Sequence, residues 1–112
     1  MASSREFVEF AADQLREAGI ITWRKMFGEY GWYCDGKFLG VICGNQLYVK
    51  TTPETREAFP QVPLELPYEG ANEYFLVEDL EERELLTRLV RATWEALPEP
   101  LPRKKRRKKD GI

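Results

Sequence analysis

The chain has 112 residues, of which 43% are hydrophobic and 12% aromatic, enough for the core of one compact domain and too many for a wholly disordered chain. Charged residues make up 32%, and no apolar run approaches the roughly 20 residues of a membrane-spanning helix, so we expect a soluble protein. The sequence has no histidine, which removes the commonest general base near neutral pH and most zinc sites. We therefore expect no enzyme activity, catalytic residue, cofactor or metal.

The net charge of −2 conceals an uneven distribution. Residues 1–102 carry 10 basic and 18 acidic side chains, whereas residues 103–112 carry 7 basic and 1 acidic side chain. An acidic body therefore ends in a cationic segment, to which any attraction for a polyanion must be assigned. We divide the chain into a domain of residues 1–101 and a basic tail of residues 102–112, which we expect to be disordered.

The N-terminus and the cysteines indicate the compartment. The first residues lead directly into an amphipathic pattern, without the apolar stretch of a secretory signal. Cys34 and Cys43 fit free thiols in a reducing cytosol. We expect a cytoplasmic protein with no disulfide.

Helical spacing and capping motifs predict three helices. Ser3-x-x-Glu6 resembles a capping box that starts a helix of residues 4–18, and Gly19 stops it. Thr52-Pro53 starts a short helix that runs to about residue 59, and Asp79-x-x-Glu82 starts one of about residues 80–97. Prolines make residues 60–70 a connecting loop.

Between residues 20 and 51 the composition becomes aromatic and β-branched, which favours strands. Asp35-Gly36 is a strong cue for a two-residue hairpin turn, and Gly44-Asn45 marks a second turn. Residues 22–27 read as an entering strand with solvated cations, and a ligand-binding loop over residues 23–28 is the alternative. Residues 73–77 form one more strand. The predicted fold class is α/β (α+β) in two layers, an antiparallel sheet with helices on one face, in the order α-β(3-4)-α-β-α.

The hairpin turn predicts the two faces of the sheet. A two-residue turn pairs Tyr33 with Phe38 and Trp32 with Leu39, and we assign the face of Tyr33 to the core. The core face then holds Tyr33, Phe38, Ile42, Leu47 and Val49. The opposite face carries Tyr30, Trp32, Leu39, Val41 and Tyr48. Such an apolar patch predicts an interaction face for a protein partner or a second copy. Two alternatives remain: the proline loop or last helix covers these rings, or a one-residue slip exchanges the faces.

The basic tail is the candidate nucleic-acid-binding segment. Its cations are Arg103, Lys104, Lys105, Arg106, Arg107, Lys108 and Lys109. They suit weak, salt-dependent contact with DNA or RNA through phosphates. Alternatives are a merely solvated end and anionic lipid headgroups, without membrane insertion.

The run from Arg24 to Phe38 resembles the signature RKMFGxYGxYxDG of the N-terminal domain of the TfoX/Sxy family, and the resemblance extends over about residues 3–98. It implies a two-layer fold similar to secretion chaperones and has no catalytic residues to transfer. Full-length members regulate natural competence and act with the cyclic AMP receptor protein at promoters. This chain has the basic tail where their separate C-terminal helical domain would begin.

These observations support a non-enzymatic regulatory or adaptor domain, related to transcription, with weak nucleic-acid contact through the tail. The alternative is a homodimeric protein-interaction module with no nucleic-acid role. A small enzyme or ligand-binding protein would need a deep pocket with converging polar groups, for which the sequence offers no reason.

Overall fold

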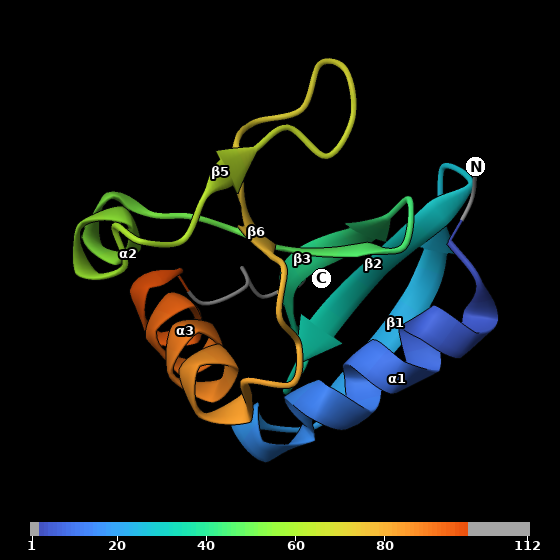
Figure 1. Cartoon of the computed structure of the whole chain (residues 1–112), viewed down its shortest axis with the longest axis horizontal. Coiled ribbons are helices and arrows are strands. Elements are labelled where there is room, and N and C mark those ends of the chain that lie inside the picture. The colour runs from blue at the N-terminus through green and yellow to red at the C-terminus, as the bar shows by residue number, and fades with distance from the viewer. Residues whose placement is uncertain (1–2, 99–112) are drawn as a thin grey trace, which may run out of the picture.

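The structure, a computed structural model, describes residues 3–98. It has the predicted class: a six-stranded antiparallel sheet packs against helices in two layers (Figure 1). The elements are α1 (Arg5–Leu15), the 3-10 turn η1 (Arg16–Ala18), β1 (Ile21–Met26), β2 (Glu29–Cys34), β3 (Lys37–Cys43), β4 (Gln46–Val49), α2 (Pro53–Ala58), β5 (Leu64–Glu65), β6 (Tyr74–Val77) and α3 (Arg83–Ala96). Within these residues no helix is long and apolar enough to cross a membrane.

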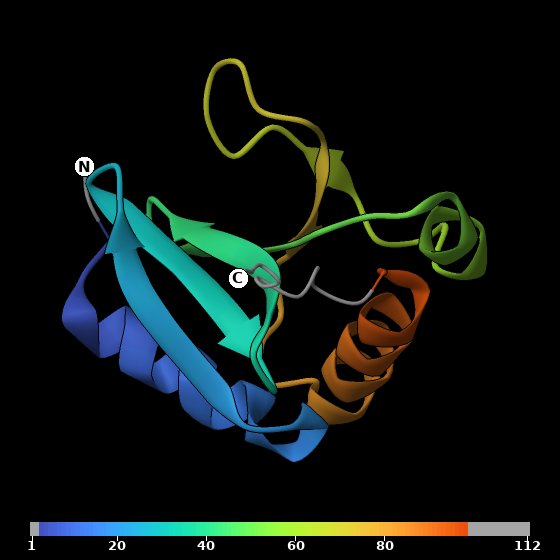
Figure 2. The same cartoon turned by 180° about the vertical axis from the view of Figure 1, so that it is seen from behind.

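Helix α1 begins one residue later than the sequence motif suggests. Ser4, not Ser3, is the N-cap, and its hydroxyl accepts a hydrogen bond of 3.1 Å from the Phe7 amide. The helix buries Val8, Ala11 and Leu15 against the sheet, and β1 and β2 lie in front of it in the view from behind (Figure 2).

Helix α3 also starts after its predicted position. The Asp79 carboxylate accepts from the amide of Glu81 in a local turn, so the proposed capping box does not form. Glu82 is the N-cap and makes no side-chain capping bond. The helix buries Leu86, Leu89 and Val90, as its apolar stripe predicts.

The predicted connecting loop of residues 60–70 contains a short strand. Leu64 pairs with Phe75 and Glu65 with Tyr74, which places β5 at the edge of the sheet in the order β1-β2-β3-β4-β6-β5. Prolines at positions 63 and 67 flank these two residues and confine the strand to an edge, where a missing N–H is tolerated.

The Asp35-Gly36 hairpin is confirmed, but the predicted register holds for only two residue pairs. Cys34 faces Lys37 and Tyr33 faces Phe38, after which the register shifts by one and Trp32 faces Gly40 instead of Leu39. The extra residue is a β-bulge, which changes the phase of side-chain alternation along β3. Both Leu39 and Ile42 consequently reach the helix side.

The predicted interaction face is therefore wrong for Trp32 and Leu39, and Tyr30 belongs to it only in part. Trp32 is 1% exposed and Leu39 is fully buried beneath the helices, and Tyr30 packs against the same core. Conversely, Tyr33 and Phe38, predicted as core, leave that cluster and contact each other edge to face at 5.4 Å. The prediction holds beyond the bulge, where Ile42, Leu47 and Val49 are core and Val41 and Tyr48 occupy the opposite face.

Candidate functional site

The sheet face opposite the helices, called the outer face below, carries a second apolar cluster. Val41, Tyr48 and Leu76 form its centre, with Phe38, Cys43 and Tyr74 around them. All six belong to β3, β4 and β6, so no helix within residues 3–98 contributes to this cluster.

Cations lie over the aromatic rings at one end of the outer face. The Arg24 guanidinium is 5.6 Å from the centre of the Tyr33 ring, and the Lys50 ammonium is 5.3 Å from that of Phe38. These contacts explain how both rings stay partly exposed beside the β2–β3 turn.

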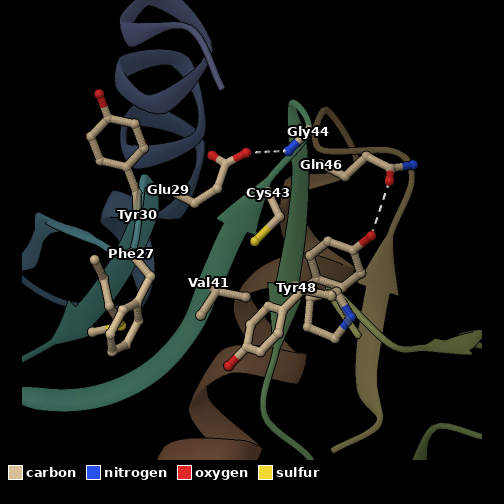
Figure 3. A pocket seen from close by; sticks show the side chains of 11 residues that line it. Phe27, Glu29, Tyr30, Val41, Cys43, Gly44, Gln46 and Tyr48 are labelled. Atoms are coloured by element: carbon tan, nitrogen blue, oxygen red, sulfur yellow. Dashed lines mark hydrogen bonds between the residues drawn. The ribbon is translucent and has the colours of Figure 1, made fainter. Parts of the chain in front are cut away.

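A cavity of about 670 Å³ lies at the other end (Figure 3). Three chain segments supply its walls: the β1–β2 turn, the strands and turn of β3–β4, and the loop after β5. Its lining residues are Met26, Phe27, Glu29, Tyr30, Val41, Cys43, Gly44, Gln46, Tyr48, Pro67 and Tyr68. The sequence analysis found no reason to expect a pocket, because these segments converge only in the folded chain. We call it the outer-face cavity.

Glu29 is the only charged residue among the lining side chains that the structure describes. Its two carboxylate oxygens accept hydrogen bonds of 2.9 Å from the Ser3 amide and 3.0 Å from the Gly44 amide. Desolvation raises the pKa of this carboxyl. The hydrogen bonds from the two amides lower the pKa by more than desolvation raises it, so the net pKa lies below its usual value. The cavity thus holds a negative charge at neutral pH.

The other polar groups of the cavity are neutral. Burial, assisted by the charge of Glu29, raises the pKa of the Cys43 thiol to about 11. The Tyr48 hydroxyl donates to the Gln46 side-chain oxygen at 3.0 Å. Burial raises the pKa of Tyr48, and the neighbouring Cys43 and Glu65 add smaller increases. A protonated thiol is a poor nucleophile.

Phe27 stands at the rim of the cavity and is fully exposed. It occupies the left-handed region with φ 53° and precedes Gly28 with φ 81°, so the β1–β2 turn sets an aromatic residue where asparagine or glycine is normally found. Tyr68, across the cavity, is 53% exposed. Neither packing nor backbone preference explains a phenylalanine at position 27.

The predicted site residues are distributed unevenly around this site. Val41 and Tyr48 line the cavity, whereas Trp32 and Leu39 are core residues. Tyr30 contacts both the core and the cavity. The seven tail cations lie outside the described residues. Sequence reasoning missed Tyr68 and placed Phe27 in a strand, although a ligand-binding loop over residues 23–28 was the alternative and the Phe27-Gly28 pair before a strand was an available signal for an exposed turn.

Lys37 does not lie beside the outer face. It is 5% exposed on the helix side, and its ammonium donates to the carbonyl oxygens of Trp94 at 2.8 Å and Leu97 at 3.1 Å. The same ammonium is 3.8 Å from the centre of the Trp94 ring. Lys37 thereby fixes the end of α3.

Comparison with known proteins shows the family of the chain. The TfoX N-terminal domain family matches residues 13–97, and the chain belongs to this family. The uncharacterized 12.7 kDa protein in the trpE 5' region of Spirochaeta aurantia is 37% identical over 112 residues, which cover 99% of this chain and 97% of that protein. Within residues 3–98, no three histidine, cysteine, aspartate or glutamate side chains gather as metal ligands.

Proposed function

We propose that this chain is a non-enzymatic regulatory or adaptor domain that binds a protein through the outer face, near the cavity. The observation that carries the proposal is the fully exposed Phe27 beside an apolar cavity. An aromatic side chain held in a strained turn costs stability and exposes apolar surface, and such features concentrate where a partner binds. The cytoplasm is the proposed compartment.

The basic tail supplies the second part of the proposal, which is weak contact with DNA or RNA. Its seven cations bind phosphates without reading sequence, so the contact weakens steeply with salt. Membership in the TfoX N-terminal family supports a role in transcription, since the family's full-length regulators act at promoters.

A photo-crosslinking phenylalanine analogue at position 27 tests the protein-binding part in cells. Phe10, 41% exposed on α1, is the matched control on the other layer. We expect a discrete adduct from position 27 that is absent from position 10. Mass spectrometry of the adduct separates a different protein from a second copy of this chain, which is the homodimer alternative. Equal adducts from both positions would contradict the proposal.

A salt titration of DNA and RNA binding tests the tail. The intact chain is compared with a variant in which serine replaces all seven cations of residues 103–109, so that the domain itself is unchanged. We expect retention at low salt only for the intact chain. Equal retention by both proteins would remove the nucleic-acid role and leave the interaction module.

A further inference from the structure

The outer-face cavity combines aromatic walls with one negative charge, the carboxylate of Glu29. Phe27, Tyr48 and Tyr68 present ring surfaces, and Glu29 supplies the carboxylate. Aromatic faces attract cations through the ring quadrupole, and an ionised carboxylate adds Coulomb attraction. A lysine or arginine side chain, with an apolar stem and a charged end, satisfies both parts of this lining.

Glu29 retains capacity for such a ligand. An ionised carboxylate offers about four acceptor positions, and two are taken by the amides of Ser3 and Gly44. These two hydrogen bonds also fix the carboxylate at the cavity wall, so it needs no reorientation to receive a third donor. Lys25 is not a lining residue of the cavity, and its ammonium lies 5.8 Å from the centre of the Tyr30 ring.

The chain carries its own source of these side chains. Residues 103–109 hold seven lysines and arginines, whereas residues 1–102 have eight more acidic than basic side chains. Opposite charges of this size attract the tail to its own body before any partner is considered. The cavity is the place on that body where a carboxylate and several aromatic rings coincide.

The tail is long enough to reach the cavity. The described residues end at Pro98, just after α3, whose end Lys37 holds beside the β2–β3 turn, while the cavity lies at the opposite ends of β2 and β3. The path along β3 is about 20 Å, with about 10 Å more to pass around the sheet. Positions 107–109 follow Pro98 by 9 to 11 residues, which can span at most about 30 to 36 Å, whereas Arg103, 5 residues after Pro98, can reach only about 17 Å.

We propose that the outer-face cavity receives a lysine or arginine side chain of residues 107–109 of the same chain. Occupation of the cavity and contact with nucleic acid then compete for the same cations. The tail is released from the cavity when a polyanion binds it, and the cavity becomes free for another ligand.

Met26 provides a direct probe because it lines the cavity and the chain has only 2 methionines. The full chain is labelled with ¹³C at the methionine methyl groups, and the Met26 signal is assigned by its loss in Met26→Leu. We expect the Met26 signal at low salt to differ between the intact chain and the variant with serine at the seven tail cations. The two signals should converge at high salt.

Two variants show whether the effect arises in the cavity. Glu29→Gln removes the charge, and Tyr68→Ser removes one aromatic wall without touching Glu29. Each should abolish most of the difference between intact and neutralised tails, whereas Glu17→Gln, an exposed carboxylate on η1, should preserve it. A difference that survives both cavity variants, or no difference at all, overturns the proposal.

Two further experiments use the Met26 signal: one shows which chain supplies the tail, and the other tests its competition with nucleic acid. Unlabelled intact chain is added to labelled chain with the neutralised tail; the Met26 signal should stay unchanged, and a shift would assign the contact to a second copy and overturn the proposal. Added DNA should return the Met26 signal of the intact chain to that of the neutralised variant. A Met26 signal that DNA leaves unchanged, although the tail retains DNA, contradicts the competition. Failure of the cavity proposal thus stays distinct from failure of the nucleic-acid role.

Discussion

The indole Nε1 of Trp32 donates a hydrogen bond of 3.1 Å to the main-chain carbonyl oxygen of Tyr48. The bond crosses β3 above Gly40, where an added Cβ would lie 2.0 Å from that oxygen and 2.7 Å from the indole nitrogen. Trp32 can therefore enter the helix-side core with its polar atom satisfied only because position 40 lacks a side chain.

Gly40→Ala should destabilise the fold by about 3 kcal/mol, since the clash is with backbone that cannot move aside. Gly31→Ala is the matched control in the neighbouring strand: its Cβ would meet the Met26 methyl and a Phe38 ring edge, which are side-chain atoms. It should cost about 1 kcal/mol. Urea denaturation of both variants measures the difference, and equal costs would contradict the role of Gly40.

Lys37→Met should cost about 2 kcal/mol, because it removes two hydrogen bonds from a charged donor to the carbonyls that end α3. Lys25→Met, at an exposed position on β1, should stay within about 0.5 kcal/mol. Hydrogen exchange should also rise at the end of α3 in Lys37→Met. Unchanged protection there would show that the helix end does not depend on Lys37.

Phe27→Asn should stabilise the domain by up to about 1 kcal/mol, because asparagine tolerates the left-handed conformation better than phenylalanine. The same variant should lose the protein partner. Ile20→Asn replaces another exposed hydrophobic residue, 74% exposed, without a positive φ, and should leave stability nearly unchanged. Thermal unfolding compares the two, and a destabilised Phe27→Asn would show that this side chain has a structural role.

Stability should fall in acid partly through Glu29. The folded state holds the pKa of this carboxyl below its usual value of 4.5, so folding favours the carboxylate. Its contribution is present above about pH 4.5 and is lost as the pH falls through the folded-state pKa. In Glu29→Gln the decline of unfolding free energy with acid should be shallower than in the parent chain. Identical slopes would contradict the assignment.

Cys43 should react slowly with iodoacetamide at neutral pH. The pH dependence of its reaction rate should have a midpoint near pH 11, compared with pH 9.0 for an ordinary thiol. Since the folded state raises this pKa, stability should decline as the pH rises from about 9 to 11. Peptide mapping separates Cys43 from Cys34, which is fully buried. A midpoint near 9 would show that Cys43 is not shielded.

Local sequence determined the hairpin at Asp35-Gly36, the apolar stripes of α1 and α3 and the family signature. Turn residues and helical spacing act over a few neighbouring positions, so they can be read without the rest of the chain. The β-bulge near Gly40 lies beside the hydrogen bond between Trp32 and Tyr48, residues 16 apart in sequence, and with the bulge the predicted faces of β2 are reversed. The outer-face cavity depends likewise on segments brought together by strand pairing and by the loop after β5. Alternation fixes which residues share a face within one regular strand, but only the packing of distant segments decides where that alternation breaks and which face the helices cover.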